Sequence, residues 1–389
     1  MPPIGGVIPY APPPTLEPPN VTDIASLRLA SQRLVGEPLP SAGDAIRWFG
    51  AVQAQDYPGA KWALGQRTQS ATDAELDRLF DDGAILRTHV MRPTWHFVLP
   101  EDARWLLELT SPRIRAGLRG RHRQLALSHY DISQAAELFR RALQGGRHLT
   151  RAELGQVLRS AGIAPDGQRL PHLLLCAELD AVIISGPRRG KQFTWVLFEE
   201  RVTNSRPLEA EEAVTELVCR YFRSHGPAQL QDFVWWSGLT MADGRRGLAA
   251  ARSALGRMTM ADKDYWLAAD GAGAPAVAAA TPTVDGLAHL LPNWDEYTVG
   301  YRDRAAAVHP DRSIDPTLLR FGSILANVVT IGGKVRGGWT RTVERGRVRV
   351  EVSPQTQLSG DEADAVRSAA RHLSRFLEQP VDVVVVRPN

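Results

Sequence analysis

The chain contains 389 residues, of which 43% are hydrophobic and 23% are charged, and its formal net charge is +3. This length can bury one large core or several small ones, and no apolar run is long enough to predict a membrane-spanning helix. The two cysteines, Cys176 and Cys219, lie in separate segments without metal-ligand spacing, which argues against both a disulfide framework and a zinc site.

Proline dominates residues 1–20, which include Pro12-Pro13-Pro14 and Pro18-Pro19. Such a segment sustains neither helix nor sheet, so we expect a disordered, extended tail. No basic stretch followed by an apolar one precedes the first predicted helix, so no secretory signal is expected.

Residues 21–130 are predicted to form a first winged helix. Apolar residues at helical spacing begin near Ile24, and Ser41 and Thr72 each precede an acidic residue by three positions, as helix N-caps do. Gly83 suits the end of the last of these helices. Strand-like runs at 85–92 and 94–98 then supply the wing.

The same order of helices and hairpin recurs twice. In residues 131–205 the helices are expected from Ser133, after Thr150 and over 170–179, followed by strands at 181–184 and 192–197. In residues 206–280 they are expected over 209–222, over 230–236 and after Thr240, followed by strands at 258–260 and 265–267. Residues 268–280, rich in alanine and glycine, are predicted to be a loop.

Residues 281–389 are predicted to form a mixed α/β region. We expect a helix near 318–325, strands at 328–331, 334–336 and 343–352 with Gly346 near a turn, a helix over 361–377 and a short buried strand at 381–386. The predicted fold class is therefore α+β: mainly α with β wings, as three tandem winged helix-turn-helix subdomains in a C-shape plus a C-terminal α/β region.

Basic residues gather in three segments that we place on hairpins or loops. With Arg92, the candidate DNA-binding residues are Arg113, Arg115, Arg119, Arg121, Arg123, Arg188, Arg189, Lys191, Lys334, Arg336, Arg341, Arg345 and Arg347. Wings and hairpin tips are where DNA-binding winged helices touch phosphate, so the three segments together favour a polyanion partner. For Arg92, a structural salt bridge is as good an interpretation as a phosphate contact.

The motif Gln53-Ala54-Gln55 follows the second predicted helix. In an extended segment both glutamine side chains share a face, whereas in a helix they lie about 200° apart. Joint action of the two amides therefore requires the helix to end near Val52. From spacing alone, the two glutamines only cap a helix or bridge two subdomains.

Four stretches resemble the AlkZ-like DNA glycosylase family, a family of bacterial winged-helix proteins. They are residues 51–56, 86–97, 226–233 and 290–304. The resemblance implies three winged helices around a DNA-sized channel, a glutamine–aliphatic–glutamine catalytic motif matched by Gln53 and Gln55, and excision of N3- or N7-alkylated purines. Some relatives remove bulky natural-product adducts or crosslinks.

The chemistry explains why two amides can suffice. An N7-alkylated guanine is already cationic, so its departure needs no general acid, unlike an ordinary glycoside. What remains is to place a water beneath C1′ and to stabilise an oxocarbenium-like sugar, and fixed dipoles can do both. Gln53 and Gln55 are therefore the candidate catalytic residues.

Other polar residues near these stretches have weaker claims to a role. Asp56 either orients a glutamine or acts as a helix-end charge, and His89 and His96 are either packed residues or face the lesion. Trp235 and Trp236 fit a core better than a stacking platform. The acidic pair Asp295 and Glu296 is interpreted as structural.

The sequence thus predicts a metal- and cofactor-independent monomer in the cytoplasm, associated with the nucleoid, that acts on double-stranded DNA containing alkylated purines. The alternative is a non-enzymatic winged-helix DNA-binding protein, either a transcription regulator or a protein that sequesters adducts. An unrelated hydrolase is disfavoured, because the chain has neither a Gly-x-Ser-x-Gly elbow nor a P-loop.

Overall fold

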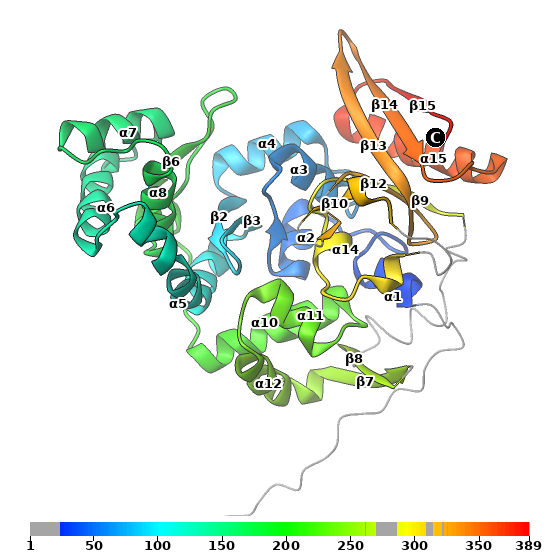
Figure 1. Ribbon diagram of the computed structural model, residues 1–389, viewed down its shortest axis with the longest axis horizontal. Helices are drawn as coiled ribbons and strands as arrows, with labels where there is room; N and C mark the ends of the chain where they lie inside the picture. Colours follow the sequence, from blue (N-terminus) through cyan, green and yellow to red (C-terminus); the bar gives the residue numbers. More distant parts are fainter. Residues whose placement is uncertain are drawn as a thin grey trace, which may run out of the picture.

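The computed structural model describes residues 24–260, 262–269, 286–308, 314–320, 323–324 and 326–388. The expected proline-rich tail and most of the expected loop at 268–280 lie outside these residues. The fold combines helices with small sheets in which nearly all strand pairs are antiparallel (Figure 1). None of the helices in the described ranges is both long and apolar enough to span a membrane.

The first part of the chain carries the glutamine motif. Its elements are α1 (Ile24–Ser31), α2 (Ala42–Phe49), β1 (Val52–Gln53), α3 (Tyr57–Gly65), α4 (Asp73–Asp82), β2 (Leu86–Val90) and β3 (Thr94–Val98). Ser41 and Thr72 cap their helices as predicted, and Gly83 ends α4 with a φ of 84°. The second helix ends at Phe49, three residues before Val52, because Gly50, with a φ of 83°, turns the chain into β1.

The second part begins with a helix that was not predicted. The elements are α5 (Pro100–Gln124), α6 (His129–Leu143), β4 (Leu149–Thr150), α7 (Arg151–Ser160), α8 (Arg169–Leu179), β5 (Ile183–Ser185), β6 (Thr194–Leu197) and α9 (Phe198–Arg201). The basic segment 112–123, expected on a hairpin or loop, lies in α5 instead. Ser128, with its capping box, begins α6 five residues before the predicted start.

The third part follows the predicted order closely. It consists of α10 (Ala210–His225), α11 (Leu230–Ser237), α12 (Met241–Ala250), the 3-10 helix η1 (Arg252–Ala254), β7 (Leu255–Met260) and β8 (Lys263–Ala268). The expected Thr240 capping box starts α12, and β7 pairs with β8 as an antiparallel hairpin.

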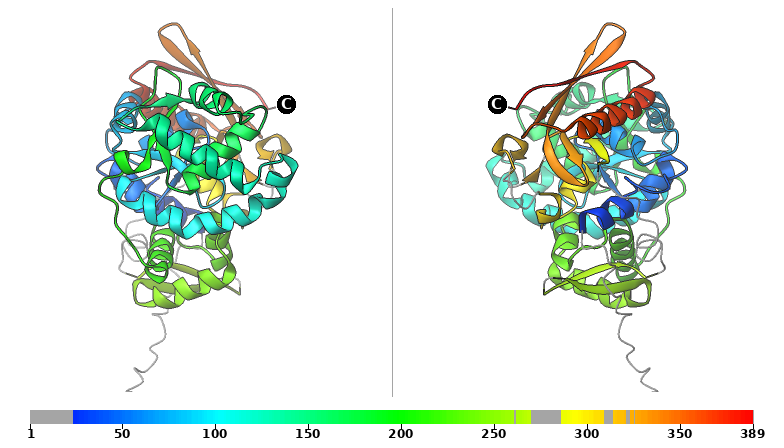
Figure 2. Two further views of the ribbon diagram at one scale, coloured as in Figure 1. Left: turned by 90° about the vertical axis from the view of Figure 1, so that its left-hand side faces the viewer. Right: turned by 90° about the vertical axis from the view of Figure 1, so that its right-hand side faces the viewer.

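The last part contains a sheet of order β15-β14-β13-β12-β9. Its elements are β9 (Ala288–Leu291), α14 (Glu296–Val299), η2 (Ala305–Ala307), η3 (Pro316–Leu318), β10 (Leu319–Arg320), β11 (Ser323–Ile324), β12 (Val328–Ile331), β13 (Lys334–Glu344), β14 (Arg347–Pro354), α15 (Gly360–Leu377) and β15 (Val381–Val385). Both views in Figure 2 show the β13–β14 hairpin projecting from the body of the molecule, with α15 lying against the sheet.

Two predictions for this part are wrong. The helix expected near 318–325 is replaced by a 3-10 turn and two short strands, because Pro316 and the capping Asp315 start only a single turn. The strand at 381–386 is not buried: β15 is the edge strand of the sheet, parallel to β14, and its residues are half-buried or exposed. The helix at 361–377 and the turn at Gly346 are as predicted.

The last part packs directly on the first. Val52 and Trp62 share one hydrophobic cluster with Val350 and Phe376. The indole of Trp62 also donates to the Leu290 carbonyl at 2.6 Å. The motif strand β1 is therefore fixed against two parts of the chain that lie far apart in sequence. The boundaries of the five predicted segments stay a prediction.

Candidate active site

Gln53 and Gln55 lie between α2 and α3, Gln53 in the strand β1 and Gln55 in a bend that follows it. Gln53 pairs with His96 across β1 and β3, and the Ala54 backbone N–H donates to the Trp95 carbonyl at 2.7 Å. The second helix ends before Val52, as joint action of the two amides requires, but β1 ends at Gln53, so a shared face for the two glutamine side chains stays a prediction. Gln53 is buried, whereas Gln55 is exposed. The side-chain carbonyl of Gln55 accepts from the Trp95 N–H at 3.3 Å.

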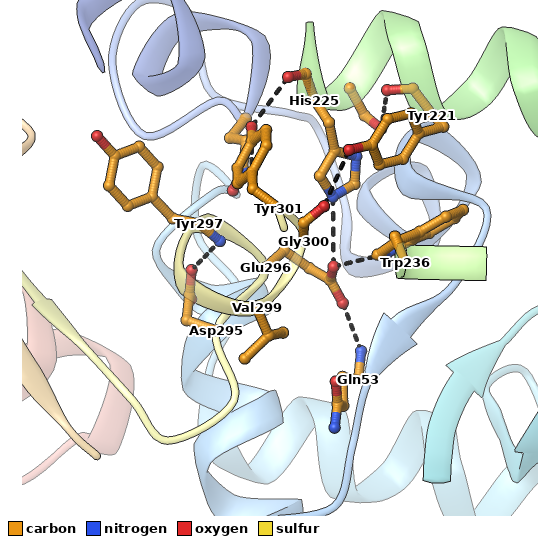
Figure 3. Close-up of polar contacts among 12 residues, drawn as sticks. Gln53, Tyr221, His225, Trp236, Asp295, Glu296, Tyr297, Val299, Gly300 and Tyr301 are labelled. Atoms are coloured by element: carbon orange, nitrogen blue, oxygen red, sulfur yellow. Dashed lines mark hydrogen bonds and ion pairs between the residues drawn. The ribbon is translucent and has the colours of Figure 1, made fainter. Parts of the chain in front are cut away.

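The carboxylate of Glu296 holds the backbone of the motif. Glu296 lies in the first turn of α14, and its Oε1 accepts from the Gln53 N–H at 2.7 Å (Figure 3). Its Oε2 accepts from the Trp236 indole at 2.9 Å and contacts His225 Nε2 at 3.3 Å. All four residues are buried. Hydrogen bonds to a buried carboxylate are among the stronger ones in proteins, so β1 is anchored at the residue that carries the first glutamine.

Glu296 is ionised at neutral pH. Burial raises the pKa of a carboxyl group, but the hydrogen bonds from His225 and from the Gln53 N–H outweigh burial, and the pKa of Glu296 lies below its ordinary value. Burial also lowers the pKa of His225. A neutral His225 satisfies both contacts if Nε2–H donates to Glu296 and Nδ1 accepts from the Ser224 hydroxyl at 2.8 Å.

Arg92 fixes the side chain of Gln53. Its Nη2 donates to Gln53 Oε1 at 3.1 Å, and its guanidinium carbon lies 5.4 Å from the centre of the Trp235 ring. Burial lowers the pKa of Arg92, although the nearby Glu296 acts in the opposite direction. A half-buried arginine in this position orients the amide of Gln53. Arg92 thus lies in the motif cluster rather than on an outer surface.

His96 is buried beside Gln53 with one ring nitrogen unpartnered. Its Nδ1 lies 2.9 Å from the Thr94 carbonyl, which can only accept, so Nδ1 carries the proton. Its Nε2 is left as an acceptor without a hydrogen-bond partner in the described structure. Burial lowers the pKa of His96 to about 4, so the ring is neutral at physiological pH. His89 differs, because its Nδ1 contacts the buried Glu178 carboxylate at 2.7 Å.

Asp56 has a structural role at the next helix. It is the N-cap of α3, and its Oδ1 accepts from the Gly59 N–H at 3.3 Å. Its other oxygen accepts from the Asn293 side chain at 3.4 Å. This agrees with the interpretation as a helix-end charge, at the start of a helix that was not predicted.

The candidate DNA-binding residues of α5 differ in whether they form hydrogen bonds or ion pairs within the protein. Those residues are Arg113, Arg115, Arg119, Arg121 and Arg123. Arg113 donates to the Gly238 carbonyl at 2.7 Å, and Arg115 forms an ion pair with Asp180. Arg119 and Arg123 are exposed.

The basic tip between β5 and β6 is mostly engaged in ion pairs. Arg188 forms bonds to Asp81 at 2.8–3.1 Å, and these carboxylate contacts raise its pKa further above the ordinary value although burial opposes them. Arg189 pairs with Glu153 at 2.7 Å. Lys191 is exposed. Two of the three basic side chains of the tip are therefore already paired with carboxylates of the protein.

The third basic group lies on β13 and β14. It comprises Lys334, Arg336, Arg341, Arg345 and Arg347. Arg336 pairs with Glu362 at 2.9 Å and Arg347 with Asp382 at 3.1 Å. Arg345 is exposed beside Gly346 at the hairpin turn. The predicted hairpin is present, and Arg345 lies at its end.

Comparison of the sequence with known proteins identifies the family of the chain. A sequence model of the family described as DNA glycosylase AlkZ-like matches residues 46–376. The chain belongs to this family. An interstrand DNA cross-link repair glycosylase of Streptomyces sahachiroi is 24% identical to this AlkZ-like chain over 361 residues, which cover 90% of the chain and 94% of that protein.

The fold of this AlkZ-like glycosylase is also that of a solved structure. The Streptomyces sahachiroi DNA glycosylase AlkZ superposes with a TM-score of 0.74 at 22% sequence identity, over 93% of this chain and 98% of that one. This likeness supports the mixed α/β fold. The family resemblance inferred from the four sequence stretches is confirmed by the match to the family.

Two members of the site were given no functional role from the sequence. Glu296 was interpreted as structural and Trp236 as a core residue, and Trp236 is indeed buried. Glu296 bonds to Gln53 of the motif, 243 positions away in sequence, and Trp236 is connected to the motif through Glu296. The one signal in the sequence was that Glu296 falls inside a stretch, residues 290–304, that resembles the family. Among the described residues, no group of three or more His, Cys, Asp or Glu side chains is placed to hold a metal.

Proposed function

We propose that this protein is a monofunctional DNA glycosylase that hydrolyses the N-glycosidic bond of cationic N3- or N7-alkylated purines, including bulky natural-product adducts and crosslinks. The observation that carries the proposal is the double fixation of Gln53. Its backbone is held by Glu296 at 2.7 Å and its side-chain oxygen by Arg92 at 3.1 Å. An amide held from two sides is a preorganised dipole, which is what such a reaction needs.

Gln53 keeps hydrogen-bonding capacity for the reaction. A side-chain carbonyl oxygen has two acceptor sites, and Arg92 fills one of them. The second accepts a proton of the attacking water, and the amide N–H groups are available for the sugar or phosphate. Gln55, two residues further along the chain and exposed, holds the same water from the solvent side. The water gives up its proton to bulk solvent after attacking C1′, while the C1′–N bond breaks and the neutral alkylpurine leaves with the bonding electrons.

Glu296 acts as a positioning residue with an electrostatic effect. Three hydrogen-bond donors surround its two oxygens, so it is not free to transfer a proton. Its negative charge nevertheless favours the positive sugar that develops in the transition state. Because neither glutamine titrates, the catalytic rate constant should vary little between pH 6 and pH 8.

The DNA-binding surface belongs to the same proposal. Helices followed by the hairpins β2–β3, β5–β6 and β7–β8 fit three tandem winged helices. Exposed Arg119, Arg123, Lys191 and Arg345 then contact phosphates on either side of the lesion. We further propose that the enzyme works as a metal-independent monomer on the nucleoid in the cytoplasm.

The proposal is tested by base release from synthetic duplexes carrying one 7-methylguanine or one bulky N7 adduct. Wild-type protein should generate abasic sites, and Gln53→Ala and Gln55→Ala should lower the single-turnover rate with DNA affinity unchanged. Gln144→Ala, at the exposed end of α6, is the matched control. EDTA should have no effect on the rate. Binding of all duplexes without release of any base would instead establish the non-enzymatic alternative.

A further inference from the structure

A pocket opens directly beside the glutamine motif. Its volume is about 690 Å³, within the range of about 300–1,000 Å³ that is usual for small-molecule sites. It is lined by Arg87, Trp95, Thr150, Arg151, Ala152, Leu170, Lys191, Gln192, Phe193 and Trp195. The first part of the chain thus supplies one wall, and α7, α8 and the β5–β6 hairpin supply the others.

Trp95 connects this pocket to the motif through its backbone. Its N–H donates to the Gln55 side chain at 3.3 Å, and its carbonyl accepts from the Ala54 N–H at 2.7 Å. Arg87 makes a second connection, because its Nε donates to the Ala54 carbonyl at 2.9 Å. A group bound in the pocket would lie next to Gln55.

The walls of the pocket are aromatic and rigid. The rings of Trp95 and Trp195 lie 6.4 Å apart, and the Trp195 indole is fixed by a bond to Glu178 at 2.7 Å. The guanidinium of Arg87 lies 4.2 Å from the centre of the Trp95 ring and 4.7 Å from that of Phe193. These contacts hold the aromatic side chains in place, which favours binding of another flat ring.

The charges of the pocket exclude the alkylated base itself. Arg87, Arg151 and Lys191 all line it, and the last two are exposed at its rim. Burial lowers the pKa of Arg87 to about 10, which still leaves its guanidinium positive at neutral pH. A cationic N7-alkylguanine would be repelled by these basic side chains, whereas an uncharged ring would not. Oxygen atoms on such a ring would accept hydrogen bonds from the rim.

We propose that this pocket binds an uncharged aromatic substituent carried by the alkyl group of the lesion, while the cationic base stays at Gln53 and Gln55. The inference rests on the proposed glycosylase function. It assigns the pocket to substrate selection, so that lesions with an aromatic substituent are preferred over a simple methyl lesion.

The test compares duplexes that carry one 7-methylguanine with duplexes that carry one 7-(naphthylmethyl)guanine. Wild-type protein should reach half-maximal single-turnover rate at about tenfold lower concentration on the naphthylmethyl duplex, the size of one aromatic stacking contact. Ala152→Trp, an exposed position on α7, fills the pocket and should abolish this preference while leaving the methyl lesion unaffected. Gln134→Trp, at an exposed position of α6 that does not line the pocket, is the control and should keep the preference.

The two proposals fail in different ways. If neither lesion is released by wild-type protein, the glycosylase proposal is wrong, and the pocket is then judged by duplex affinity alone, measured with the Gln53→Ala/Gln55→Ala variant. If that variant binds both lesions equally, or if Ala152→Trp keeps the preference for the naphthylmethyl duplex, the pocket assignment is overturned.

Discussion

Replacing Glu296 by Gln tests whether the buried carboxylate positions the motif. The substitution keeps the volume but replaces one acceptor oxygen with an NH₂ donor. Gln53 N–H donates to one oxygen, and Trp236 and His225 meet the other. His225 can switch its tautomer, but the backbone N–H and the indole N–H cannot. Either orientation of the new amide therefore leaves one buried donor facing another donor.

The expected cost follows from these contacts. One charge-assisted hydrogen bond is lost, and the two that remain become neutral; each charged bond contributes about 1.5–3 kcal/mol. We expect Glu296→Gln to reduce the free energy of unfolding by about 3 kcal/mol. Because β1 is released at Gln53, the single-turnover rate should fall roughly 100-fold, the effect of a displacement of about 1 Å in a reacting group. DNA affinity should stay within about twofold.

Asp102→Asn provides the matched control for this substitution. Asp102 is also buried and accepts from an indole, that of Trp105, at 2.8 Å, while its other partner is Arg220. It should lose similar stability without losing rate, when both variants are measured well below their unfolding temperatures. Denaturant titration gives the stability and an abasic-site assay gives the rate. Equal rates for Glu296→Gln and Asp102→Asn would refute the positioning role of Glu296.

Three further predictions concern pH, Arg92 and salt. His96 and His289 have pKa values of about 4 in the folded protein and about 6.5 in the unfolded chain. Because the unfolded chain takes up protons first, the free energy of unfolding should fall as pH drops from 6.5 to 4, by at most about 3 kcal/mol for each histidine. A denaturation midpoint that stays constant across this range would contradict the prediction. Arg92→Met should lower the rate constant about tenfold and leave the DNA affinity nearly unchanged. A weakened DNA affinity at an unchanged rate constant would instead indicate that Arg92 contacts a phosphate. Arg345→Ala should reduce the log–log salt dependence of DNA binding by about 1, while Arg141→Ala, paired with Glu137 on α6, should leave it unchanged.

Local rules of sequence predicted most elements correctly. Helix caps at Ser41, Thr72, Thr150 and Thr240 depend only on a side chain three residues from its partner, and all four are present. Such signals were recognisable because they do not depend on the rest of the fold. The same kind of signal exists for α3, where Asp56 is the cap; the interpretation of Asp56 as a helix-end charge agrees with this, although the helix itself was not predicted.

The failures have physical causes as well. Pro112 inside residues 100–124 argued against a continuous helix, yet α5 runs through it, since burial of residues such as Trp105 and Ile114 holds the helix against the rest of the core. The charges of Arg188 and Arg189 were predictable, but their partners Asp81 and Glu153 lie 107 and 36 residues away. Pairing across such distances leaves no local pattern.

The candidate site shows the same difference between local signals and contacts that are distant in sequence. The two glutamines were recognisable from the motif, whereas the strand that carries Gln53 and the carboxylate that holds it were not predicted. This difference has a chemical consequence. The one carboxylate bonded to Gln53 is occupied by three donors and remains ionised, so it cannot protonate a leaving group. Under the proposed function, this arrangement suits a base that departs without protonation, and an alkylated purine that already carries a positive charge meets that requirement.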